Sequence, residues 1–331
     1  MRYPAKYWIP VVLLSLPIAS ELILRWGLGL GNPPLLQADS EMGYRFQSNQ
    51  KIERLGKRIE YNQYSQRSEP ISGEKPKGTL RILMTGDSVL NGGNPIDHKE
   101  TISELLEARL SHSGQRVEVL NASAGSWGIG NQLGYLRAFG TLDSDVLIVQ
   151  IGTHDLTQPT STRDRVGTDP NYPNRSPTLA LQELFVRYLL PQLALRLNKS
   201  APPPEIPSPE DTEVQFQQNL QALQTLVRLA ERQGSGVCVL YTPNWTDVLP
   251  APNFPPYKAK FFQLLQSLQI PVIDIHSVWS QLPTTTVESY FRDSVHLTVA
   301  GNRAIAEQLF PIFSQLQTSP CYSKKQTLPN L

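Results

Sequence analysis

The sequence has little net charge, little cysteine and no closely spaced metal-binding side chains. The 30 Lys and Arg residues nearly balance the 29 Asp and Glu residues, and a net charge of +1 gives no reason to expect a nucleic-acid partner. Two cysteines are too few for a disulfide scaffold, and we expect Cys238, inside an apolar strand, to be a buried thiol and Cys321 to lie in a polar tail. No Cys or His residues stand at the close spacing of metal ligands, so we expect no structural zinc.

The amino-terminal hydrophobic run is short for a membrane span. It covers residues 8–20, follows Arg2 and Lys6, and suits the core of a signal peptide. If the helix continues to residue 30, Glu21 and Arg25 lie four residues apart and can pair on one face. We therefore favour an uncleaved membrane anchor over residues 1–30, with the following domain on the periplasmic or extracellular side. Cleavage of this segment, or its burial as an ordinary helix, stays open.

Downstream, apolar strands alternate with helices, which is typical of a parallel sheet covered on both faces. The pattern predicts an α/β fold, a three-layer α/β/α sandwich whose five parallel strands take the flavodoxin-like order 2-1-3-4-5. The expected strands cover residues 79–85, 116–120, 145–151, 236–241 and 271–275. We divide the chain into an amino-terminal segment (1–30), an extension and linker (31–78), a catalytic-type domain (79–318) and a tail (319–331).

Two regions depart from a minimal domain of this kind. The extension carries charges of both signs over residues 51–67, which we interpret as a solvated hairpin. An insertion over residues 158–212 holds a polar loop, an apolar helix at 178–197 and a proline-rich stretch. A long loop beside an active-site strand is often a lid or a substrate wall. We expect the apolar helix to pack on the domain, with contact to a membrane as the alternative.

Polar side chains gather where the expected strands end. Ser88 follows the first strand, residues 121–128 follow the second, His154 follows the third, and Asp293 and His296 follow the fifth. In an open parallel sheet, ligands bind outside the carboxyl ends of the strands. A serine needs a base within hydrogen-bond reach to act as a nucleophile, and an Asp three residues before a His can orient the imidazole. The pattern predicts a site with Ser88 as nucleophile, His296 as base and Asp293 as its orienting acid.

These stretches resemble the GDSL/SGNH hydrolase family. Gly86-Asp87-Ser88 is similar to its first sequence block, and Asp293-x-x-His296 to its last; the resemblance covers roughly residues 79–316. It implies acyl transfer from an ester through a Ser88 acyl-enzyme, with no cofactor. Asp87 is expected to bind backbone amides of the turn and not to orient the base.

The resemblance also implies donors to the oxyanion, and here the sequence departs from the family pattern. The Ser88 backbone N–H is one donor; the glycine donor of the second block falls on Gly125, with Ser126 and Gly128 as alternatives. The third block reads Gly152-Thr153-His154-Asp155, so His154 stands where the family has Asn. A His N–H can replace the amide, with a dependence on pH. The other histidines in the domain (His98, His112 and His276) are expected to be structural.

Three functions remain open at this stage. The favoured one is a serine esterase acting on an ester-bearing lipid or glycan, such as acetyl esters of envelope or exported polysaccharide. A polysaccharide O-acetyltransferase would use the same three residues, and a closed lid over residues 158–212 would favour it because water must be excluded. A non-catalytic envelope binding protein is the third, suggested by His154. The acyl group, the acceptor and the oligomeric state are not determined by the sequence.

Overall fold

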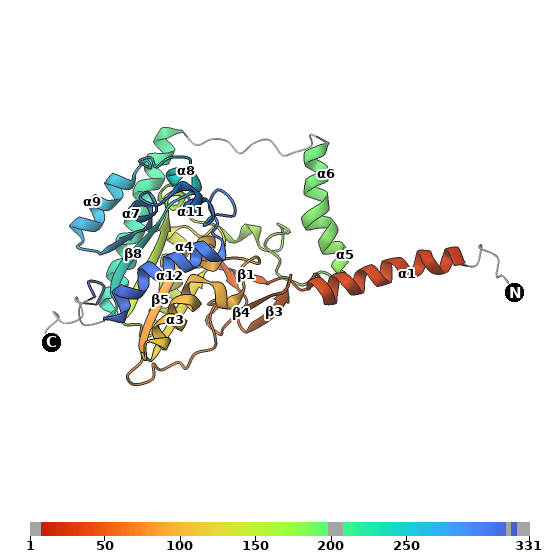
Figure 1. Ribbon diagram of the computed structural model, residues 1–331, viewed down its shortest axis with the longest axis horizontal. Helices are drawn as coiled ribbons and strands as arrows, with labels where there is room; N and C mark the ends of the chain where they lie inside the picture. Colours follow the sequence, from red (N-terminus) through yellow and green to blue (C-terminus); the bar gives the residue numbers. More distant parts are fainter. Residues whose placement is uncertain (1–7, 198–207, 316–318, 323–331) are drawn as a thin grey trace.

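The computed structural model describes residues 8–197, 208–315 and 319–322, and its centre is a five-stranded parallel sheet between two layers of helices (Figure 1). The strand order is β6-β5-β7-β8-β9, which is 2-1-3-4-5 in chain order and confirms the predicted topology. The strands are β5 (Leu80–Gly86), β6 (Val117–Ser123), β7 (Val146–Gly152), β8 (Gly236–Thr242) and β9 (Val272–Asp274). The predicted strands overlap all five, so the fold class is confirmed.

The central strands are apolar because both faces of the sheet are covered. Every residue of β5, β7 and β8 is buried. One face packs on α4 (Ile129–Phe139), α7 (Pro209–Arg232) and α9 (Lys258–Ser267). The other packs mainly on α3 (Ile102–His112) and α12 (Val299–Ser314), with α10 (Ile275–Trp279) and α11 (Thr284–Glu288) beside them. This burial fixes the strand register. The register in turn fixes where the residues that follow each strand lie along the carboxyl edge of the sheet.

The extension forms two antiparallel hairpins. They are β1 (Leu36–Asp39) with β2 (Gly43–Phe46), and β3 (Gln50–Arg54) with β4 (Lys57–Tyr61). The prediction of a solvated hairpin over residues 51–67 is wrong for its key charges, because Arg54 and Arg67 are fully buried. The Arg67 guanidinium donates to the carbonyls of Asn91 and Gly93, both at 2.6 Å, on the chain just after the Ser88 turn. The extension is therefore packed against the domain.

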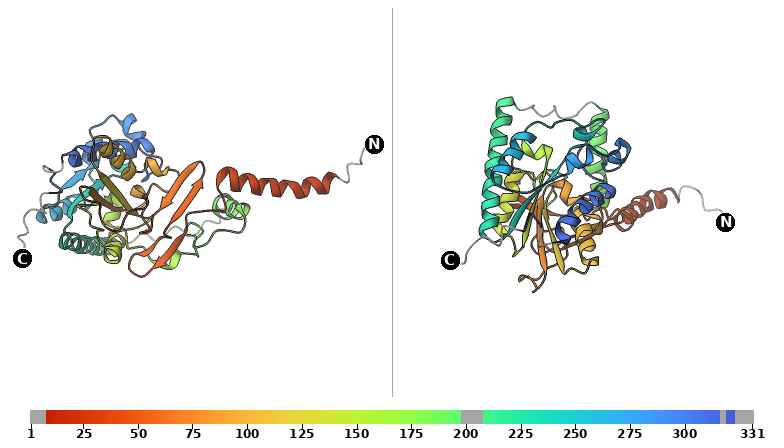
Figure 2. Two further views of the ribbon diagram at one scale, coloured as in Figure 1. Left: turned by 90° about the horizontal axis from the view of Figure 1, so that it is seen from below. Right: turned by 60° about the vertical axis from the view of Figure 1, so that its left-hand side comes forward.

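The amino-terminal segment forms α1 (Trp8–Leu22), followed by the π-helical turn η2 (Ile23–Gly27). Both views in Figure 2 show α1 extending away from the body of the protein. The predicted pair of Glu21 and Arg25 is confirmed at 2.8 Å. The Glu21 carboxylate also accepts the backbone N–H groups of Ala180 and Leu181, which open α5 (Ala180–Glu183). This end of the helix is thus bound to the insertion by polar contacts.

Among the described residues, no helix has both the length and the apolar character needed to cross a membrane. The transmembrane anchor expected over residues 1–30 therefore has no counterpart in the described helices. The regular α-helix ends at Leu22, and the charged pair near its end is engaged with α5. Residues 1–7, with the expected basic flank, lie outside the described residues.

The insertion helix also differs from its prediction. After α5 the chain continues through a second π-helical segment, η6 (Leu184–Leu189), into α6 (Leu190–Arg196). Its large apolar side chains are exposed, among them Phe185, Leu193 and Leu195. Figure 1 shows α6 standing apart from the sheet. The expectation that this helix packs on the domain is wrong beyond its first turn, because only the α5 end, at Glu183, is buried by the hairpins.

The two cysteines form a disulfide. Cys238, in the middle of β8, is bonded to Cys321, with a Cα–Cα separation of 5.5 Å. Both are buried, and the prediction of a free thiol at Cys238 is wrong. The bond joins residues 83 positions apart, so the sequence gives no local sign of it. It ties the segment 319–322 to a central strand of the sheet.

Candidate active site

Ser88 lies at the point where the first strand of the core turns into a helix. β5 ends at Gly86, Asp87 is the N-cap, and Ser88 is the first residue of α2 (Ser88–Asn91). The Asp87 carboxylate accepts the Val89 N–H at 2.8 Å, which holds the turn as expected. A side chain at Gly86 would collide with Gln150, whose Oε1 also accepts the Asp87 N–H at 3.1 Å. The turn is thereby held tightly against β7.

His296 and Asp293 lie on the loop between α11 and α12. The His296 Nε2 atom is 2.9 Å from the Ser88 Oγ atom, across 208 residues of sequence. Its Nδ1 atom is 2.8 Å from Asp293 Oδ2. The Asp293 Oδ1 atom also accepts the backbone N–H groups of Val295 and His296. The structure thus brings together the three residues to which the sequence assigned nucleophile, base and acid.

These contacts keep the Asp293 carboxylate ionised. Partial burial would raise its pKa, but the backbone N–H groups of His296 and Val295 and the His296 ring lower it below the usual range for Asp. An ionised carboxylate at Nδ1 places the proton there and leaves the Nε2 lone pair for the Ser88 hydroxyl. The Asp293 and His296 side chains are 47% and 33% exposed, so water can reach this part of the site.

Of the three candidate oxyanion donors on the turn after β6, Gly125 borders open space. A Cβ atom built on Gly125 would meet nothing within 4 Å, and a cavity of about 190 Å³ opens beside it. Ser126 has a positive φ of 60°, its carbonyl accepts Gln158 Nε2, and its Oγ accepts the Tyr172 hydroxyl at 3.0 Å. A Cβ on Gly128 would lie 3.2 Å from the Pro159 carbonyl oxygen. The insertion loop therefore covers the two alternatives and leaves Gly125 accessible.

His154 uses both ring nitrogens within the protein. Its Nε2 atom is 2.7 Å from Asp87 Oδ2, and its Nδ1 atom is 2.9 Å from Asn244 Oδ1. Burial alone would lower the pKa of His154, but the charges of Asp155 and Asp87 and these hydrogen bonds raise it to about 10. The ring is therefore a cation at neutral pH and donates both N–H groups. The sequence suggested that His154 has an N–H group free to donate to an oxyanion. In the structure both ring nitrogens are instead hydrogen-bonded to protein side chains.

Asp87, His154 and Asp155 also lie at separations that a metal ion could bridge. Both ring nitrogens of His154 are already hydrogen-bonded within the protein, Nε2 to Asp87 and Nδ1 to Asn244. Asp155 instead accepts the Gly152 N–H at 2.7 Å through Oδ2, as an N-terminal cap of η4 (Thr153–Leu156). We read this cluster as a charged hydrogen-bond network behind Ser88.

Sequence reasoning missed two residues of this network. Asn244 follows β8, caps α8 (Trp245–Val248) and binds the His154 ring. Gln150, inside β7, donates to Thr242 and accepts from the Asp87 amide. Asn244 was detectable in principle, because it stands at the carboxyl end of a core strand like the other site residues. Gln150 is a lone polar residue in an apolar strand, and nothing in the sequence indicates its partners.

A larger cavity of about 440 Å³ lies elsewhere, between the insertion loop and α5. Its lining includes Pro33, residues 167–170 and residues 173–178, and none of Ser88, Asp293 or His296. This cavity and the candidate catalytic residues are thus separate. The chain also forms two short 3₁₀ helices: η3 (His98–Glu100), which precedes α3, and η5 (Arg163–Arg165), in the insertion loop.

Comparison with known proteins finds one family model that matches most of the domain. The model of the GDSL-like lipase/acylhydrolase family matches residues 84–304. No curated protein sequence matches the chain. Solved structures that resemble it include a GDSL-family lipolytic protein from Veillonella parvula (14% identity, 72% of this chain and 100% of that chain, TM-score 0.42). Another is a psychrotrophic esterase from Pseudoalteromonas sp. (12% identity, 70% of this chain and 94% of that chain, TM-score 0.42). A third is a carbohydrate acetylesterase family member from Sinorhizobium meliloti (12% identity, 70% of this chain and 96% of that chain, TM-score 0.39).

Proposed function

The chain belongs to the GDSL-like lipase/acylhydrolase family, and we propose that it is a serine esterase whose catalytic residues are Ser88, His296 and Asp293. The observation that carries the proposal is the 2.9 Å contact between Ser88 Oγ and His296 Nε2, with Nδ1 held by Asp293. Nucleophile, base and orienting acid at hydrogen-bond distances are what acyl transfer to a serine requires. The same contacts argue against a binding protein that has lost catalysis.

In the proposed reaction His296 takes the Ser88 proton while Oγ attacks the ester carbonyl. The tetrahedral intermediate collapses when His296 returns this proton to the departing alcohol, which leaves an acyl-Ser88 ester. A water molecule then gives its proton to His296 and attacks the acyl carbon, and the proton finally returns to Ser88 Oγ as the acid leaves. Asp293 remains ionised throughout and stabilises the imidazolium that forms twice per cycle.

We assign the oxyanion to the backbone N–H groups of Ser88 and Gly125. Ser88 is the first residue of α2, so its N–H has no partner inside the helix. Gly125 borders the accessible cavity. His154 serves as a fixed cation behind these donors, where it stabilises negative charge that develops on the substrate. Its hydrogen bond to Asp87 also positions the turn that carries Ser88.

Substituting His154 by Asn should lower the free energy of unfolding most at pH 6. The folded-state pKa of about 10 lies above the ordinary value of 6.5, so protonation stabilises the fold fully below pH 6.5. This contribution is lost as the pH rises through about 10, and the difference between His154→Asn and the native protein should shrink accordingly. Urea denaturation at pH 6, 8 and 10 measures it, with the exposed His112→Asn as control.

His154→Asn, together with His154→Ala, also tests whether His154 contributes to turnover. If its charge acts on the oxyanion, His154→Ala should lower kcat with little change in KM, and His154→Asn should recover part of the loss. An unchanged kcat in His154→Ala would remove His154 from the mechanism and leave it a structural group.

Hydrolysis is favoured over transfer to a glycan hydroxyl by the exposure of Asp293 and His296. The acyl-enzyme of a transferase must be shielded from water, and α6, the helix of the insertion, stands away from α11 and α12, between which these residues lie (Figure 1). We further propose that the enzyme acts outside the cytoplasm, on acetyl esters of envelope or exported polysaccharide. The disulfide supports this location, because such bonds persist in oxidising compartments.

The acyl preference is tested with p-nitrophenyl esters of increasing chain length. We expect kcat/KM to be highest for acetate and to fall by about tenfold or more at octanoate, because the proposed natural substrates are acetyl esters. The same reactions with an added oligosaccharide acceptor separate the two activities by mass spectrometry. Acetylated oligosaccharide in place of free acetate would establish the transferase and overturn the hydrolase.

A further inference from the structure

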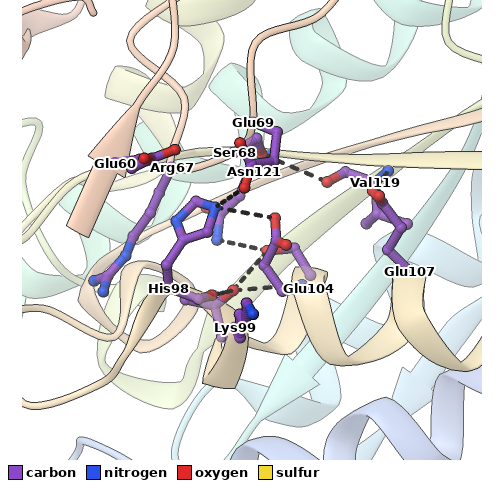
Figure 3. Close-up of polar contacts among 12 residues, drawn as sticks. Glu60, Arg67, Ser68, Glu69, His98, Lys99, Glu104, Glu107, Val119 and Asn121 are labelled. Atoms are coloured by element: carbon purple, nitrogen blue, oxygen red, sulfur yellow. Dashed lines mark hydrogen bonds and ion pairs between the residues drawn. The ribbon is translucent and has the colours of Figure 1, made fainter. Parts of the chain in front are cut away.

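Three glutamates and one histidine from four segments converge beneath the extension, away from the catalytic residues. Glu60 is in β4, Glu69 is on the chain after it, His98 opens η3, and Glu104 is in the first turn of α3. Figure 3 shows the His98 ring lying between Glu69 and Glu104. The cluster therefore joins the extension to the catalytic domain.

His98 is fully buried, and neither of its ring nitrogens has a hydrogen-bond partner. The Nε2 atom lies 3.7 Å from Glu69 Oε1 and 3.6 Å from Glu104 Oε1, too far for hydrogen bonds and pointing between them. An unpartnered buried imidazole facing carboxylates requires an explanation.

One carboxylate of the cluster also has an unpartnered buried atom. The Glu60 Oε2 atom is buried without a hydrogen-bond partner. Ligand atoms of Glu60, Glu69 and His98 all lie within 4.8 Å of one another. Ligands at about 2.1 Å from a tetrahedral ion stand roughly 3.4 Å apart, close to the 3.6 Å and 3.7 Å separations at His98. Small side-chain movements would bring these atoms to coordination distance.

We propose that His98, Glu60 and Glu69 form a binding site for a divalent transition-metal ion, of the class of Zn²⁺, with Glu104, 3.6 Å from His98 Nε2, as the fourth ligand. One imidazole and carboxylate oxygens are ligands that Zn²⁺ accepts, whereas Mg²⁺ and Ca²⁺ prefer oxygen alone. The site is structural: it fastens β4 and the following chain to α3. Arg67, in that chain, holds the carbonyls of Asn91 and Gly93 next to the Ser88 turn. The ion would thus stabilise the support of the active site without contacting substrate.

Arg58 competes with the ion for the same carboxylates. Its guanidinium donates to Glu69 Oε1 at 2.6 Å and lies 3.8 Å from Glu60 Oε1. The side chain is 36% exposed and can turn into solvent when a metal binds. This competition gives the site a signature that a purely structural ion-pair cluster lacks: removing Arg58 should tighten metal binding.

The test is calorimetric titration of the chelator-treated full-length protein with Zn²⁺, together with its melting temperature. We expect one saturable equivalent and a rise in Tm on binding. His98→Gln should weaken binding by about 100-fold or more and abolish the rise, because the nitrogen ligand is lost. His112→Gln, at the exposed opposite end of α3, is the matched control and should bind as the native protein does.

Two further variants keep the outcome decisive. If His98→Gln fails to fold, Glu69→Gln, at a half-exposed position, must show the weakened binding instead. Arg58→Gln should lower the Kd for Zn²⁺ by several-fold. The proposal is overturned if the native protein shows no saturable binding, which would indicate a water-filled polar cluster, or if His98→Gln and Glu69→Gln bind Zn²⁺ unchanged, which would indicate an adventitious surface site.

Discussion

Replacing Ser88 by alanine is expected to reduce ester turnover by on the order of 10⁴-fold or more, with the fold intact. The Oγ atom of Ser88 is hydrogen-bonded to His296, and its loss removes the atom that accepts the acyl group. The backbone of Ser88 still begins α2 and still presents its N–H, so substrate binding and the oxyanion donor are kept. The measurements are kcat on p-nitrophenyl acetate and covalent labelling by a fluorophosphonate.

A matched control is Ser267→Ala, which changes an exposed serine at the end of α9 whose hydroxyl donates to the Leu264 carbonyl. It should label and turn over as the native protein does. His296→Ala should lower kcat by about as much as Ser88→Ala does, and the double variant should lower it little further, because the two side chains act as one unit. Labelling that persists in Ser88→Ala would place the nucleophile elsewhere and refute the proposed mechanism.

The residues of this site were predictable because their positions follow from two simple regularities. Continuous apolar runs bounded by Gly and polar residues identify buried parallel strands, as for β5 and β7. The carboxyl ends of parallel strands share one edge, so the sequence alone gathers Ser88, His154 and His296 there. The contacts at that edge were not predictable in detail. The two bonds of His154 depend on Asn244, whose side-chain position is set by the start of α8.

Long-range polar contacts account for most of what the sequence did not reveal. The charges of β3 and β4 look like those of any exposed hairpin, yet Arg54 is buried because Glu183, 129 residues later, meets it. The cluster around His98 escaped detection for a related reason. Metal sites are recognised in sequences by closely spaced Cys and His, whereas this cluster has one His and carboxylates from separate segments. Only folding brings such groups together.

The buried ion pair of Arg54 and Glu183 should show the largest effect on stability. Both side chains are almost wholly buried, at 0% and 1% exposure, and Arg54 Nη1 is 3.3 Å from Glu183 Oε2. The Gly31 N–H donates to the same oxygen, so the pair joins residues 29–31, β3 and α5. Arg54→Met leaves the buried Glu183 carboxylate without one of its positive partners. We therefore expect the free energy of unfolding to fall by about 3 kcal/mol. Hydrogen exchange of the amides in β3, β4 and α5 measures this loss directly.

The location of the pair determines how the loss should be distributed. Because Arg54 and Glu183 lie outside the central sheet, amides of β5, β7 and β8 should keep their protection while those of β3 and α5 exchange faster. Arg109→Met is the matched control, since its pair with Glu307 is about half exposed and should contribute below about 1 kcal/mol. The double variant Arg54→Met with Glu183→Leu should recover much of the loss, because no charge is then buried unpaired. Equal exchange in Arg54→Met and Arg109→Met would mean that burial of this pair does not hold the extension and the insertion together.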